Sequence, residues 1–164
     1  MAKFQDEQRD HEYDNLLADI IEHKDDVVAK VYRSYAERHI EIDVRKNGGE
    51  YVYLIASVYE KGYPPRYLII DAWPELSDFE ARTRQIETQQ REFYQEWHRT
   101  AQRGKDHPDG GGKVNEQFLD KHSRKVIVTR SEPDLAAITL AKRVNIVLII
   151  QEGPRRFRLA DDTT

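Results

Sequence analysis

Residues 124–150 constrain the fold more than any other part of the chain, because they pass from a strand pattern to a helix pattern and back. A short apolar run at 126–128 is followed by apolar residues at helical spacing and then by the wholly apolar run 146–150. A strand that is apolar at every position is covered on both faces, as in a parallel sheet. Such a strand–helix–strand unit joins parallel neighbours by a right-handed crossover. The segment therefore predicts an α/β fold.

The helix within this unit has a recognisable start and end. Ser131 is the predicted N-cap, and residues 132–134 bring negative charge and a proline to the first turn. Lys142 and Arg143 stand in the last turn, where the helix dipole favours positive charge. These signals place one short helix between the two strands.

The rest of the chain adds a meander of strands and two further helices. Residues 11–38 have the apolar spacing of a helix with a polar break at 23–26, and Ser77 caps a long charged helix at 77–103. Alternating residues and turn signals predict strands at 40–45, 51–59, 67–70 and, at an edge, 155–159. We expect a single mixed sheet, an antiparallel three-stranded meander plus the parallel β-α-β unit, flanked by helices.

Length and composition indicate one globular domain in a reducing compartment. The chain has 164 residues, enough for an independent core, and it has no cysteine, which excludes disulfides and thiolate chemistry. No apolar run approaches the roughly 20 residues of a membrane span, and the polar start is not a signal peptide. We expect a cytoplasmic protein without membrane contact, with a disordered segment at 1–10, a domain at 11–160, a mobile loop at 104–114 and a tail at 161–164.

Charge is distributed unevenly although the net charge is only −4. Residues 1–30 carry nine acids against four bases, and residues 121–158 carry nine bases against three acids. A basic half can mark a surface for DNA or RNA, or its charges can simply solvate the ends of strands and helices. The candidate nucleic-acid-binding residues are Arg124, Lys125, Arg130, Arg155, Arg156 and Arg158.

The long helix carries large apolar side chains along one narrow side, at Phe79, Ile86, Phe93 and Trp97. Spacings of seven, seven and four resemble half of a coiled-coil seam, which would make this side a homodimer interface. The alternative is a helix that lies on the sheet, because the intervening seam positions are polar.

The order of elements, together with the stretches IVTRS and LAKRVNIVLI, resembles the restriction-endonuclease-like, or PD-(D/E)XK nuclease, fold and in particular its Mrr-type branch. The resemblance covers residues 12–150 in element order and 124–150 in motif. It implies an Asp on one strand and an acidic-x-Lys triplet on the next, whose carboxylates hold Mg²⁺ or Mn²⁺ to activate water.

The catalytic residues that this resemblance implies are incomplete. Asp43 stands at the place expected for the first Asp, but residues 56–58 read Ala-Ser-Val where the triplet is expected. If the strand at 67–73 carries the motif instead, Asp71 supplies one acid and again no lysine follows. Each acid also has a simpler interpretation, because Asp43 can face solvent on an alternating strand and Asp71 can cap backbone amides.

Tyrosines are concentrated between residues 51 and 67. They could stack on nucleobases with basic neighbours, or they could serve simply as good strand formers. The residues concerned are Tyr51, Tyr53, Tyr59, Tyr63 and Tyr67, with Arg45, Lys46 and Arg66.

Three functions fit these observations. The first is a nucleic-acid-associated protein of nuclease-like fold that has lost catalysis and needs no cofactor. The second is an assembly module that self-associates through the helix at 77–103 or an edge strand. The third is an active Mg²⁺- or Mn²⁺-dependent nuclease that uses Asp43, Asp71 and the displaced pair Glu60 and Lys61. The sequence favours them in that order.

Overall fold

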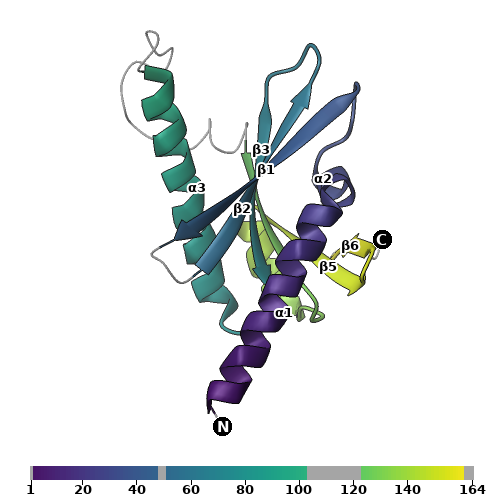
Figure 1. Cartoon of the computed structure of the whole chain (residues 1–164), viewed down its shortest axis with the longest axis vertical. Coiled ribbons are helices and arrows are strands. Elements are labelled where there is room, and N and C mark those ends of the chain that lie inside the picture. Colours follow the sequence, from purple (N-terminus) through teal and green to yellow (C-terminus); the bar gives the residue numbers. More distant parts are fainter. Residues whose placement is uncertain (1, 48–50, 103–122, 161–164) are drawn as a thin grey trace.

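A computed structural model of the protein describes residues 2–47, 51–102 and 123–160. This part of the chain forms one six-stranded mixed sheet flanked by four helices (Figure 1). The elements are α1 (Ala2–Glu22), α2 (Lys24–Val31), β1 (Arg38–Asn47), β2 (Tyr51–Glu60), β3 (Arg66–Trp73), α3 (Phe79–Gln102), β4 (Ser123–Thr129), α5 (Leu135–Arg143), β5 (Ile146–Gly153) and β6 (Arg156–Leu159).

The strands lie in the sheet in the same order as in the chain, from β1 to β6. The pairs β1–β2 and β2–β3 are antiparallel, whereas β3–β4 and β4–β5 are parallel. Strand β6 then turns back and pairs antiparallel with β5. The predicted α/β class, the antiparallel meander and the parallel β-α-β unit are therefore confirmed.

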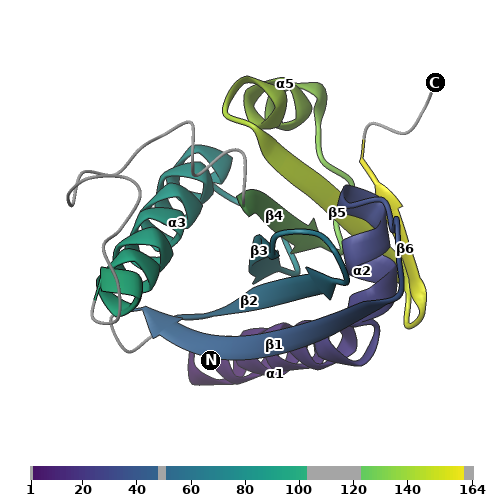
Figure 2. The same cartoon turned by 90° about the horizontal axis from the view of Figure 1, so that it is seen from above.

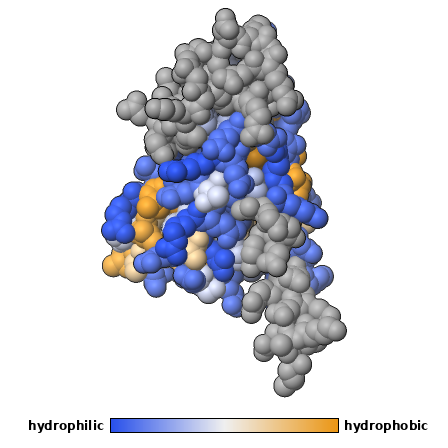
Figure 3. All heavy atoms as spheres, turned by 90° about the vertical axis from the view of Figure 1, so that its left-hand side faces the viewer, coloured by the Kyte–Doolittle hydropathy of each residue, from blue (hydrophilic) through white to orange (hydrophobic). Residues whose placement is uncertain are grey.

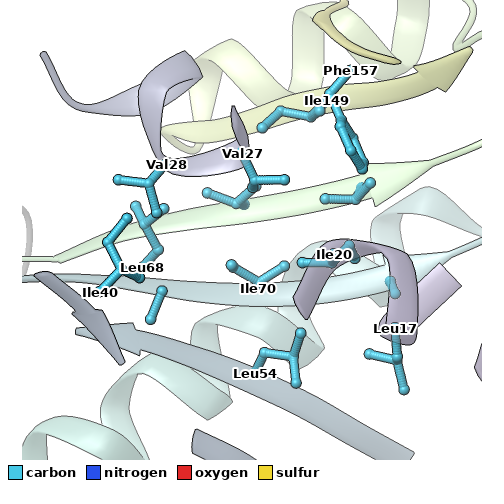
Figure 4. Close-up of a cluster of buried hydrophobic side chains, with 14 of the residues drawn as sticks. Leu17, Ile20, Val27, Val28, Ile40, Leu54, Leu68, Ile70, Ile149 and Phe157 are labelled. Atoms are coloured by element: carbon cyan, nitrogen blue, oxygen red, sulfur yellow. The ribbon is translucent and has the colours of Figure 1, made fainter. Parts of the chain in front are cut away.

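Helices α1 and α2 cover one face of the sheet, which we call the first face (Figure 2). Buried side chains from both helices meet those of all six strands, as the close-up of Figure 4 shows for Ile20, Val27, Leu54, Leu68 and Ile149. The break between the two helices falls at His23, inside the predicted polar stretch. Alternation along the strands directs Leu68 and Ile70 to this face and their neighbours to the other.

Helices α3 and α5 cover the opposite, second face (Figure 2). Ile86 of α3 is fully buried there, with Phe79 and Phe93 packed beside it. Seen from the side of α3, the described surface is mostly hydrophilic (Figure 3). The long helix therefore directs its narrow apolar side toward the sheet, and its charged side faces outward.

Two predicted helix ends are wrong. Asp134, not Ser131, caps α5, and its carboxylate accepts a hydrogen bond from the Ala137 amide at 2.8 Å. The Ser131 hydroxyl instead accepts a bond from the Leu76 amide at 3.0 Å, so it is used to anchor the segment after β3. The helix predicted to run to residue 38 ends earlier, at Val31, and Tyr35, which was expected on its apolar face, is 60% exposed.

Several predictions fall on residues outside the described ranges. The glycine-rich loop at 104–114, the glycines of the β1–β2 turn and the tail at 161–164 are among them.

Helix α1 begins at Ala2, ahead of the predicted start at residue 11. None of the described helices is both long enough and apolar enough to cross a membrane.

Candidate functional site

A carboxylate lies buried in the middle of the sheet, beneath helix α3. Asp71 belongs to β3, an interior strand with β2 on one side and β4 on the other. Its side chain is 0% exposed and points to the second face, because it alternates with Ile70 and Ala72, which belong to the core of the first face. Buried acids are rare unless they are paired, so this position is a candidate site.

Other polar and aromatic side chains surround Asp71. Gln89 of α3 is fully buried, and the guanidinium carbon of Arg82 lies 3.5 Å from the ring centroid of Trp73. Arg82, Ile86, Gln89 and Phe93 follow one another at steps of three or four residues, which places them on the side of α3 that meets the sheet. The cluster is therefore built from β3 and one helical stripe.

The carboxylate of Asp71 lies near several polar groups but is not hydrogen-bonded to any of them. The Trp73 indole, the Arg82 guanidinium and the Gln89 amide lie close enough to favour its charged form. None of them forms a hydrogen bond of normal geometry with either carboxylate oxygen. Burial outweighs these groups and raises the pKa of Asp71 to about 7.

Tyr53 of β2 belongs to the same neighbourhood. It is 4% exposed and shares the second-face core with Ile69 and Trp73. Burial raises the pKa of Tyr53, and the negative charges of Glu92 and Asp71 add to that effect. The phenol is therefore a neutral group beside Asp71.

This arrangement can hold a proton near neutral pH but cannot by itself hold a divalent cation. A protein site for Mg²⁺ or Mn²⁺ combines several oxygen ligands, usually with more than one carboxylate or with substrate phosphates. No group of three or more His, Cys, Asp or Glu side chains that could hold a metal occurs in the described ranges. Asp71 has no second carboxylate beside it in that part of the chain.

The structure does not bring Asp43 to Asp71. Asp43 lies on β1, the edge strand, with its side chain 68% exposed, and its carboxylate is 3.8 Å from the Arg45 guanidinium. Glu60 lies at the other end of β2 from Tyr53, where it is buried and bonded to Arg66 at 2.7 Å. Lys61 follows in an exposed turn. The displaced catalytic set is thus spread over the sheet.

The six candidate nucleic-acid-binding bases divide between two ends of the sheet. Arg124 and Lys125 start β4, whereas Arg130 follows its end and the remaining three lie at the β5–β6 turn and on β6. These residues do not form one patch. They also differ in whether their charged groups already form hydrogen bonds or ion pairs within the molecule.

Three of the six bases are engaged internally. The Lys125 ammonium is buried and donates to the Val144 carbonyl at 2.8 Å. Arg130 donates to the Gln151 amide oxygen at 2.8 Å, and Arg158 pairs with Glu132 and Glu152. Arg124, Arg155 and Arg156 have no ion pair with the described residues.

The proposed interface side of α3 is occupied within the molecule. Phe79, Ile86 and Phe93 belong to the core of the second face, and the Phe93 ring centroid lies 4.9 Å from that of Tyr67. The side chain of Trp97 is outside the described set. The alternative in which the helix lies on the sheet is therefore confirmed for these three residues.

A pocket of about 340 Å³ lies away from Asp71, beside the first half of β5. Strand β6 pairs only with the later part of β5, from Ile149 onward, so the edge beside Ile146 and Val147 stays open there. The ends of α2 and α5 approach this edge from the two faces. Its basic lining residues are Lys30, Arg124 and Lys142.

The sequence points to Asp71 but not to Gln89, Tyr53 or Trp73 as its neighbours. Gln89 repeats at helical spacing with Ile86 and Phe93, which is the one signal that could have found it. No family model matches the chain, and no curated protein or solved structure matches it either.

Proposed function

We propose that the protein associates with nucleic acid through a nuclease-like fold whose metal-dependent active site has been lost. The strand order, with β2 and β6 antiparallel to the other four strands, is compatible with the restriction-endonuclease-like arrangement that the motif at 124–150 resembles. A cleaving member of that class needs an Asp and an acidic-x-Lys triplet on adjacent strands, with the metal held between them.

The observation that carries this proposal is the composition of the site around Asp71. If β3 carries the motif, Asp71 takes the place of the triplet's acid, and the residue two positions later is Trp73 instead of a lysine. On the adjacent strand, the neighbouring side chain is Tyr53 instead of an aspartate. One buried carboxylate between two aromatic side chains can bind a proton, but it has too few oxygen ligands for a catalytic metal.

Binding without cleavage is supported by the bases that stay available. Arg124, Arg155 and Arg156 have no acidic partner among the described residues, and the last two are exposed. Each such side chain can contact a phosphate and release a counterion, which makes the affinity depend on salt.

Fluorescence anisotropy with labelled single- and double-stranded DNA and RNA tests the proposal at two salt concentrations, with Mn²⁺ present and the products run on a gel. We expect binding that weakens as salt rises and no cleavage. The double variant Arg155→Gln/Arg156→Gln should lower the salt slope by about 1 for each phosphate that the variant no longer neutralises, and Arg84→Gln, on the outside of α3, is the matched control. Cleavage that Asp71→Asn abolishes would overturn the loss of catalysis. Absence of binding at low salt would overturn the association with nucleic acid.

A further inference from the structure

Exposed aromatic side chains gather at the end of the sheet that carries the β2–β3 turn and the α2–β1 connection, at the top of Figure 1. Tyr35 is 60% exposed and Tyr63 is 50% exposed, yet their rings stack with centroids 5.7 Å apart and planes at 27°. Tyr59 stacks in the same way on His39, with centroids 6.5 Å apart. Flat aromatic faces that stay in solvent mark a surface that binds another molecule.

Two bases without an acidic partner in the described ranges lie beside the stacked tyrosines. The guanidinium carbon of Arg33 lies 6.0 Å from the Tyr35 ring centroid, and Lys61 stands two residues before Tyr63 in the turn. Neither base is paired with an acid in the described ranges. Of the acids at this end, Glu60 is buried and compensated by Arg38 and Arg66, at 3.8 and 2.7 Å. Glu41 lies 3.2 Å from His39, and Glu37 is exposed. The occupant should therefore combine flat rings with negative charge.

The basic surface continues from the tyrosines toward the pocket beside β5. The guanidinium carbon of Arg66 lies 4.4 Å from the Tyr32 ring centroid, and Arg124 is also close to Tyr32. Burial raises the pKa of Tyr32 to about 12, although the positive charges of Arg124 and Arg66 act to lower it. Val31, the last residue of α2, precedes Tyr32 and lines the pocket with Arg124 and Lys30. None of the described residues that line the pocket is acidic.

We propose that this end of the molecule binds a single-stranded nucleic acid, with unpaired bases on Tyr35 and Tyr63 and phosphates at Arg33, Lys61 and Arg124. Only a single strand offers base faces to aromatic side chains, because a duplex buries them in its own stack. The inference rests on the proposed function and adds its substrate class and a second contact surface, separate from Arg155 and Arg156 at the β5–β6 turn. It also places the binding surface at the opposite end of β3 from Asp71.

The test compares the binding of an oligothymidine strand and a DNA duplex to the full chain by fluorescence anisotropy. Stacking contributes about 1–3 kcal/mol per base, so Tyr35→Ala/Tyr63→Ala should weaken single-strand binding by at least about tenfold and leave duplex binding unchanged. Tyr35→Phe/Tyr63→Phe keeps the ring faces and should bind as the wild type does. Leu135→Ala, which removes another exposed apolar side chain, is the matched control.

A second arm addresses the phosphates. Arg33→Gln/Lys61→Gln should reduce the slope of log affinity against log salt for the single strand by roughly 1.4, or about 0.7 for each contact. Single-strand binding that neither double variant alters would overturn this surface while leaving the proposed function intact. If the wild type binds no nucleic acid at low salt, both proposals fail.

Discussion

The two faces of the sheet are packed by different rules. The first face buries apolar side chains from α1, α2 and all six strands. The side-chain amide of Gln151, at its margin, donates a hydrogen bond to the Asp19 carboxylate at 2.8 Å. The second face buries Asp71, Gln89, Gln90 and Lys125 among its apolar residues. Some of these are satisfied, such as Gln90, which bonds to Ser123 at 2.8 Å, but Asp71 and Gln89 are not. The first face therefore stabilises the fold by apolar burial. The second face contributes less to the free energy of unfolding, because it buries polar groups that make no hydrogen bonds.

The sharpest way to break this comparison is to add a charge to the apolar part of the second face. Ile86→Asp would bury a carboxylate with no partner, which should cost about 5 kcal/mol and unfold the domain. Circular dichroism and light scattering would show lost structure. A folded Ile86→Asp protein of half the wild-type mass would instead show that α3 mediates a dimer.

The second test removes the charge of Asp71. A carboxyl whose pKa is raised from 3.8 to about 7 keeps its proton in the native state after the unfolded state has lost it. Wild-type stability should therefore fall by about 1.4 kcal/mol per pH unit between those two values and level off above the higher one. Asp71→Asn should lack this component and be the more stable protein above neutral pH, by on the order of 4 kcal/mol. Urea melts of both proteins across this range would measure the difference, and parallel curves would contradict it.

A large-to-small change on the first face has a smaller effect. Leu68 is fully buried between helices and strands, so Leu68→Ala should lower the free energy of unfolding by about 3 kcal/mol. Leu135 is 79% exposed, and Leu135→Ala should change it by less than about 0.5 kcal/mol. Equal losses from both variants in denaturant melts would show that the first face is not close-packed.

The smallest effect has the opposite sign. Gln89 buries an amide whose polar atoms make no hydrogen bond, so Gln89→Leu should raise the free energy of unfolding by about 1 kcal/mol. It should also raise the pKa of Asp71 further, because one group that favours the carboxylate is removed. Denaturant melts measure the first effect and carboxyl NMR titration the second. A lower free energy of unfolding for Gln89→Leu would show that the Gln89 amide makes stabilising contacts with its polar neighbours.

Helices and strands were predictable from the sequence where a few consecutive residues show which side chains are buried. The wholly apolar run 146–150 in β5 and the run 126–128 in β4 indicate cover on both faces, and the break at His23 follows from a run of polar residues. The cap of α5 is not predictable in this way, because Ser131 and Asp134 are both good caps and the choice depends on the contact between Ser131 and Leu76 across the fold.

The site was predictable only in part, because long-range pairing decides which polar residues are buried. Asp43 and Asp71 each follow an isoleucine in a predicted strand, but β1 is an edge strand and β3 an interior one. Gln89 is fully buried whereas Gln95 on the same polar helix is exposed. Only the helical spacing of Gln89 with Ile86 and Phe93 separates the two, and it does not show that Gln89 lies beside Asp71. For Lys125, too, no local pattern shows that the ammonium group turns inward to reach the end of α5.

The parallel pairing of β3 with β4 also has a kinetic consequence. Hairpins join β1 to β2 and β2 to β3, and β5 to β6, so these contacts form between near neighbours in the chain. By contrast, β3 meets β4 through pairs such as Tyr67 with Ser123, which are far apart in the chain. The entropy cost of closing this long loop comes before the contacts between the two strands can offset it. Refolding should therefore be limited by the docking of two preformed halves, and mutations at the β3–β4 seam should slow folding more than they speed unfolding.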